Sequence, residues 1–195
     1  MPENLGFLTV IDQTPAGLTG GFLILNRVGR PLEFYCTVPL LPEKIQQILY
    51  GDTLLPFLYG ERIAQTLLQR SKLPILTIFT NVAMVLSAQT STVHPVIYVF
   101  DCLTKSRIDD VSNSIPMHEI SEELSESFQI PRVSGFDIEN WRPVCVGNRL
   151  IAVPDTKNTT REELVSQIKV MARTIDLLEP FARIRHALDE ARNTA

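Results

Sequence analysis

GGFLILNRVGRPLEFYCT, residues 20–37, is the stretch that decides the fold of this 195-residue chain. Residues 22–25 form a continuous apolar run, which suits a strand covered on both faces. Asn26 and Gly29 lie in the turn that follows, where both can adopt the positive φ angles that a short loop requires. Residues 32–38 then alternate partly in polarity, as a strand with two different faces does. The stretch predicts a β-hairpin.

The flanking segments extend this hairpin on both sides. LGFLTVI, residues 5–11, is rich in strand-forming residues, so we expect a three-stranded antiparallel meander over residues 5–38. Residues 42–70 predict helices, because Pro42 suits the first turn of a helix. The second helix carries an apolar residue at every fourth position, and we expect this face to lie on the sheet. Its members are Leu55, Tyr59, Ile63 and Leu67, and Leu58 and Leu68 widen the same face.

Later apolar runs predict more strands and a second hairpin. Residues 75–79 and 95–100 are expected to be strands, and residues 142–146 and 149–153 should pair around a two-residue turn. The sequence does not decide whether residues 82–88 form a strand or a helix.

The last part of the chain predicts a long helix over residues 159–192. Its apolar positions follow a heptad spacing, which suits packing either on the protein's own sheet or against a second copy. Pro180 should kink or split this helix. The heptad positions are Leu164, Ile168, Met171, Ile175, Leu178 and Ala182.

These segments together predict an α+β fold. We expect a largely antiparallel sheet, beginning with the N-terminal meander, that is covered by helices and closed by the long C-terminal helix. The chain is expected to form a single domain, residues 1–195. Its polar stretch 103–117 should be a mobile surface loop.

Composition and charge narrow the function. The net charge is −4 and the pI is near 5.4, so no basic field is available to attract phosphates and nucleic acid is an unlikely partner. No apolar run reaches the ~20 residues that cross a bilayer, and no signal peptide is recognisable. The three cysteines, Cys36, Cys102 and Cys145, have no metal-ligand spacing and suit a reducing compartment. We therefore expect a cytoplasmic protein without membrane contact.

Catalytic motifs are scarce in this sequence. No glycine-rich phosphate loop precedes a helix, so no cofactor is expected. The three histidines, His94, His118 and His186, have no nucleophile or soft ligand nearby in the sequence, so no metal site is expected either.

Three carboxylates provide the one enzymatic alternative. Asp12 ends the first strand, Glu61 lies on the helix after the meander, and Asp101 ends a later strand. This order resembles that of the ribonuclease H-like nucleases. In those enzymes a carboxylate cluster holds two divalent ions that stabilise the attacking and leaving oxygens of a phosphodiester. The resemblance implies a metal-dependent nuclease that uses Asp12, Glu61 and Asp101.

A second resemblance rests on GGFL, GRPLEF and LYG within residues 20–68. This pattern resembles an uncharacterised bacterial family with a GG(F/Y)L strand, a GRPLEF strand and an LYG helix end. It implies a bacterial, cytoplasmic origin and supplies no activity, cofactor or catalytic residue.

The sequence as a whole therefore indicates a non-enzymatic interaction or regulatory module of a bacterial cytoplasmic assembly. We expect a protein partner or self-association, as in a homodimer, while any small ligand stays unknown. Tyrosine and arginine favour interface centres because they combine a large area with a polar group. The expected contact residues are Arg30, Glu33, Tyr35, Tyr50 and Tyr59.

Overall fold

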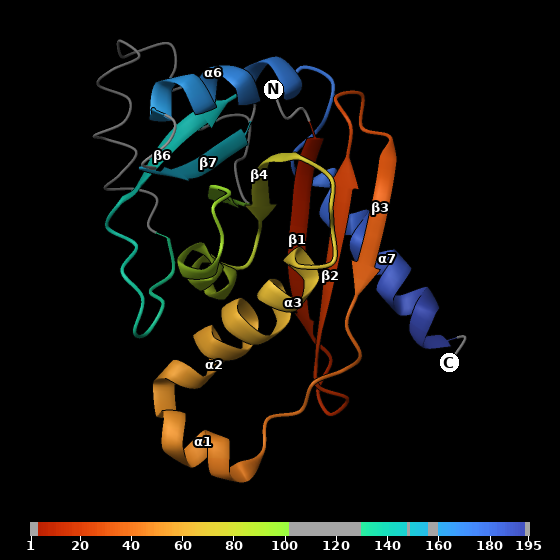
Figure 1. The fold of residues 1–195 in the computed structure, drawn as a ribbon, viewed down its shortest axis with the longest axis vertical. Helices are drawn as coiled ribbons and strands as arrows, with labels where there is room; N and C mark the ends of the chain where they lie inside the picture. The colour runs from red at the N-terminus through yellow and green to blue at the C-terminus, as the bar shows by residue number, and fades with distance from the viewer. Residues whose placement is uncertain (1–3, 102–129, 148, 156–159, 194–195) are drawn as a thin grey trace.

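The central feature of the computed structural model is a seven-stranded sheet (Figure 1), with the strand order β3-β2-β1-β4-β5-β7-β6. The structure describes residues 4–101, 130–147, 149–155 and 160–193. The strands are β1 (Asn4–Asp12), β2 (Leu18–Leu25), β3 (Pro31–Cys36), β4 (Ile75–Thr80), β5 (Val96–Val99), β6 (Trp141–Val146) and β7 (Arg149–Pro154).

The N-terminal meander is confirmed. β1 pairs antiparallel with β2, and β2 pairs antiparallel with β3. In the turn between β2 and β3, the Asn26 side chain accepts hydrogen bonds from the backbone N–H groups of Val28 and Arg30. Gly29 there has a φ of 76°, a value that favours glycine.

The rest of the sheet is mixed in direction. β4 lies parallel to β1 and β5 lies parallel to β4, whereas β7 is antiparallel to β5 and to β6. Antiparallel pairing predominates, which confirms the α+β expectation. The carboxyl ends of β1, β4 and β5 therefore belong to the same edge of the sheet, and we call it the carboxyl edge.

One face of the sheet is covered by the helical segments between residues 54 and 91. The helix over residues 44–50 buries no residue and lies below the strands in Figure 1. The sequence left residues 82–88 undecided; residues 83–88 belong to a 3-10 helix, and Val82 is extended. The elements are α1 (Lys44–Tyr50), η1 (Gly51–Thr53), α2 (Leu54–Pro56), η2 (Phe57–Ala64), α3 (Gln65–Leu68) and η3 (Ala83–Ser91).

The helix over residues 54–68 buries part of the expected face but differs from it at the start. Leu58, Ile63 and Leu67 are buried as expected, whereas Leu54 is buried in place of Leu55, which is exposed. The spacing from Leu58 to Ile63 is five residues because η2 is a π-helix, which inserts one extra residue into a turn. The four-residue repeat read from the sequence therefore selects the wrong face at the start of this helix.

The other face is covered by α6 (Arg161–Met171) and α7 (Glu179–Asn193). The C-terminal segment is thus two helices, and Pro180 lies in the first turn of the second. Most of the heptad positions pack into the protein's own core, and α7 continues this packing through Phe181, Ile184 and Leu188. Among the described residues, no helix has the length and apolar character needed to cross a membrane. The predicted polar loop 103–117 lies outside the described residues.

Candidate functional site

The carboxyl edge brings together two polar side chains from adjacent parallel strands. Phe7 of β1 is paired with Phe79 of β4, so that Thr9 and Asn81 lie at the same level two residues further along. The Thr9 hydroxyl donates a hydrogen bond of 2.8 Å to the Oδ1 atom of Asn81. Thr9 is buried, whereas Asn81 is half-buried and reaches the surface.

Asp12 lies at the end of β1 but belongs to the opposite face of the sheet from Thr9. Successive side chains of a strand alternate between faces. Leu8 and Val10, which share the parity of Asp12, pack under the α2–α3 helices. The Asp12 carboxylate accepts hydrogen bonds from the backbone N–H and the hydroxyl of Thr14, at 3.0 and 2.6 Å. The Asp12 carboxylate therefore stabilises the turn that follows β1.

Tyr59, on η2, lies close enough to Asp12 for the carboxylate charge to affect its hydroxyl. Burial raises the pKa of Tyr59 above its ordinary value, and the negative charge of Asp12 raises the pKa further. This coupling agrees with the position of Asp12 on the face of the sheet that the α2–α3 helices cover.

Asp101 lies elsewhere, beside the end of β5. β5 is separated from β1 by β4, so the two strands are about 10 Å apart. Burial raises the pKa of Tyr98, and the charge of Asp101 adds to this increase. The same charge also helps to raise the pKa of Arg149, after the larger effect of its hydrogen bond to Asp176.

Glu61, the third carboxylate, is exposed on η2 and lines a cavity of about 260 Å³ together with Tyr50 and Thr90. Within the described parts of the chain, no three His, Cys, Asp or Glu side chains are grouped so that they could hold a metal ion. Asp12, Glu61 and Asp101 therefore do not form the metal site that the nuclease alternative requires.

A second cavity, of about 560 Å³, adjoins the first. Both are lined by Ser134 and Phe136, which makes them neighbours across this segment. The larger cavity also has Arg132 and Arg142 on its walls, together with the acidic residues Asp137 and Glu139. Its charges are therefore balanced.

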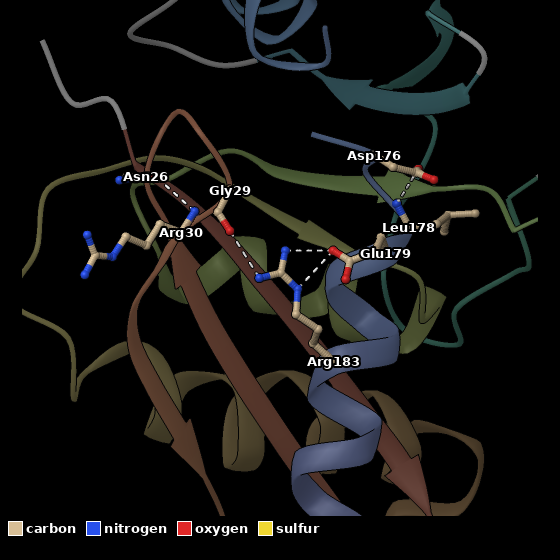
Figure 2. Close-up of polar contacts among 7 residues, drawn as sticks. All are labelled: Asn26, Gly29, Arg30, Asp176, Leu178, Glu179 and Arg183. Carbon is tan, nitrogen blue, oxygen red and sulfur yellow. Dashed lines mark hydrogen bonds and ion pairs between the residues drawn. The ribbon is translucent and has the colours of Figure 1, made fainter. Parts of the chain in front are cut away.

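The expected contact residue Arg30 lies in the turn between β2 and β3 (Figure 2), where its side chain points away from α7. Its backbone N–H donates to Asn26. The turn is held instead by Arg183, which donates a hydrogen bond to the Gly29 carbonyl at 3.1 Å and pairs with Glu179 at 2.7 Å. Arg183 thus joins the hairpin to α7.

The other expected contact residues are dispersed. Glu33, on β3, accepts a hydrogen bond from the Ser71 hydroxyl at 2.7 Å, and Tyr35 packs against the core under the helices. Tyr50 stacks on Phe57, with ring centroids 4.6 Å apart. Tyr59, as described above, lies near Asp12. The five residues thus occupy four environments: the β2–β3 turn, β3, the stack on Phe57 and the vicinity of Asp12.

Sequence reasoning missed Thr9 and Asn81. Asn81 was visible only as a polar residue between two apolar runs, and Thr9 only as a strand residue. The signal that joins them is the pairing of β1 with β4, which links residues 72 positions apart. Such a contact appears only when the order of the strands is known.

Comparison with known proteins adds information at the level of the fold. No protein-family model matches the sequence, and no curated protein is similar to it in sequence. Among solved structures, the catalytic domain of human Endonuclease V is similar over 100% of this chain and 85% of that one, with 10% identity and a TM-score of 0.52. Ciona intestinalis Endonuclease V, in complex with a 23mer DNA containing an inosine followed by a ribo-adenosine, is 14% identical with a TM-score of 0.48, over 97% and 86% of the two chains.

These similarities correct three expectations drawn from the sequence. The main interpretation, a non-enzymatic protein-interaction module, is wrong, because the chain is similar in fold over its length to the catalytic domain of human Endonuclease V. For the same reason, the prediction that the protein functions through protein–protein contacts, with a partner or with a second copy, is wrong. The expectation that nucleic acid is an unlikely partner is also wrong, because the chain shares its fold with a protein that acts on nucleic acid. Net charge describes the whole surface and does not exclude a local contact.

Proposed function

We propose that this protein is a nucleic-acid-processing protein with a ribonuclease H-like fold, and that it receives a nucleic-acid strand at its carboxyl edge. The observation that carries the proposal is the fold similarity to the Endonuclease V catalytic domain, which extends over the whole chain. The sheet order supports it, because β1, β4 and β5 are neighbours in the sheet and run parallel, with β4 between the other two. In open sheets with parallel strands, ligands bind outside the carboxyl ends of those strands.

The divalent ions that this fold implies do not fit the described residues. Magnesium and manganese require several carboxylate or other hard oxygen ligands that converge on one point. At the carboxyl edge, the side chains that meet between β1 and β4 are a threonine and an asparagine. We therefore assign no reaction step to a metal ion held by Asp12, Glu61 and Asp101.

The cellular setting proposed here is the cytoplasm. Cys36 and Cys145 are free thiols, a state that suits a reducing compartment. We also propose that the chain acts as a single domain, since one continuous sheet connects its described segments.

The test is a panel of binding and cleavage assays on the purified full-length chain. Fluorescently labelled single-stranded and double-stranded DNA and RNA are titrated with the protein, and fluorescence anisotropy reports binding while gel electrophoresis reports cleavage. The proposal predicts saturable binding to at least one class, weakened by added salt because phosphate contacts release counterions. A folded protein that binds none of these nucleic acids would disprove the proposed function.

A further inference from the structure

We infer that Asn81 is a metal-independent contact for the nucleic-acid strand, and that its side-chain amide donates hydrogen bonds to phosphate oxygens. The inference rests on the proposed function and names the part of the carboxyl edge that carries it. Three observations support it: the fixed orientation of the amide, its free donors and the neutral charge of the pair.

The orientation of the Asn81 amide is fixed by Thr9. Because the Thr9 hydroxyl donates to Oδ1 at 2.8 Å, the Nδ2 group of the same amide points the other way. Thr9 is only 2% exposed, so its side chain is held by the packing around it. A buried residue thus positions the half-buried residue beside it.

The Nδ2 group of Asn81 carries two N–H donors. Within the described parts of the chain, the structure records a hydrogen bond for Oδ1 but none for Nδ2. A half-buried donor that already has a fixed direction loses little conformational entropy when it binds an acceptor. Asparagine is one of the residues that commonly contact phosphate oxygens in complexes with nucleic acid.

The pair of Thr9 and Asn81 is uncharged, and this favours a phosphate over a metal ion as its ligand. A carboxylate pair at this position would attract divalent cations and repel a bare phosphate. The amide and the hydroxyl attract divalent cations far less, and the Nδ2 donors of the amide suit an anionic oxygen directly. The carboxylate of Asp12 belongs to the opposite face of the sheet and is held by Thr14. A phosphate at Asn81 therefore meets donors from the protein without needing a cation between them.

The experiment uses two substitutions with nearly unchanged shape. Asn81→Asp replaces the Nδ2 donors with a carboxylate oxygen, and Thr9→Val removes the hydroxyl that orients the amide. Asn140→Asp, at an exposed position, is the control for the same change of charge. Each full-length variant is titrated into a labelled single-stranded DNA oligonucleotide and into its RNA equivalent, with magnesium chloride and then with EDTA. Thermal unfolding followed by circular dichroism checks that each variant is folded.

The inference predicts that the natural protein still binds in EDTA, with no loss of affinity relative to magnesium chloride beyond the effect of salt itself. Asn81→Asp should weaken binding about tenfold, because two donors are lost and a repulsive charge is added. Thr9→Val should weaken it about threefold, because the amide is no longer oriented. Asn140→Asp should have no effect beyond the small change that any added negative charge produces.

Three results would overturn the inference while leaving the proposed function intact. They are binding that EDTA abolishes, binding that survives both Asn81→Asp and Thr9→Val in folded protein, and calorimetric titration that shows manganese binding to the natural protein which Thr9→Val weakens. If the natural protein binds no oligonucleotide, the proposed function itself is wrong and the inference falls with it.

Discussion

Gly60 of η2 lies directly against Ser87 of η3, so closely that a Cβ atom on Gly60 would overlap the Ser87 hydroxyl and crowd the backbone of residues 87–88. The Ser87 hydroxyl donates a hydrogen bond of 2.8 Å to the carbonyl of Pro56, in the turn before η2. The two helical segments thus meet at a glycine and are joined by a buried serine. This contact fixes the helix layer over the central strands.

The substitution Gly60→Ala should destabilise the protein by about 1–3 kcal/mol, because the added methyl group overpacks this contact. Alanine's better helix propensity, worth about 1 kcal/mol, offsets only part of that loss. Urea unfolding followed by circular dichroism measures the free energy of unfolding. The exposed neighbour gives the control, since Glu61→Ala should change stability by less than about 0.5 kcal/mol. Equal stability of the Gly60→Ala and natural proteins would show that the helices are not packed in this way.

The separation of Asp12 from Asp101 can be tested through the tyrosines beside them. Burial is the larger cause of the raised pKa of Tyr59 and of Tyr98, and the neighbouring aspartate is the second cause. Asp12→Asn should therefore lower the pKa of Tyr59 partway toward its ordinary value of about 10 and leave Tyr98 unchanged. Asp101→Asn should do the reverse.

The measurement is a pH titration of the tyrosine ring carbons by NMR, with each resonance assigned by a Tyr→Phe variant. If both substitutions shifted the same tyrosine, the two carboxylates would lie together, and a shared metal site would have to be considered again.

Arg149, at the start of β7, and Asp176, in the segment before α7, form a bidentate ion pair. Its two hydrogen bonds, from Nε to Oδ1 and from Nη2 to Oδ2, measure 2.9 and 2.7 Å. Hydrogen bonding from Arg149 lowers the pKa of Asp176 more than burial raises it. The pair's contribution to stability is therefore fully present above the unfolded-state pKa of about 3.9. It is lost as the pH falls through the lower pKa of the folded state.

Asp176→Asn should cost about 0.5–1 kcal/mol at neutral pH, a modest amount because solvent screens a partly exposed pair. The difference from the natural protein should shrink in acid, which denaturant unfolding at a series of pH values would measure. Asp52→Asn, at an exposed position, serves as the control. A cost that stays the same down to the lowest pH would mean that the ion pair does not form.

Local sequence signals were sufficient for much of this fold. Gly29 and the alternating residues after it predicted the first hairpin, and Pro180 predicted the division of the C-terminal segment, because both effects depend on neighbouring residues only. The face of the helix over residues 54–68 could not be predicted in the same way. Its π-helical turn accompanies the contact of Gly60 with Ser87, a residue 27 positions away.

The candidate site depended even more on distant contacts. Asp12, Glu61 and Asp101 have the chemistry of metal ligands and occur in a suggestive order, but strand alternation and the position of β4 keep Asp12 and Asp101 apart. Thr9 and Asn81 have no such chemical signal, and only the pairing of β1 with β4 brings them together. The prediction that nucleic acid is an unlikely partner rested on the net charge of −4, which says nothing about one edge of the sheet.

The most direct test of the central claim is to map the nucleic-acid contact by NMR. A ¹⁵N-labelled full-length protein is titrated with a single-stranded oligonucleotide that binds in the anisotropy assay, and changes in amide chemical shift are followed. The account predicts the largest changes at Thr9 and at Asn81 and its neighbours, with little change at Arg30 or Glu33. Changes confined to the edge formed by β3, or no changes in a folded protein, would contradict it.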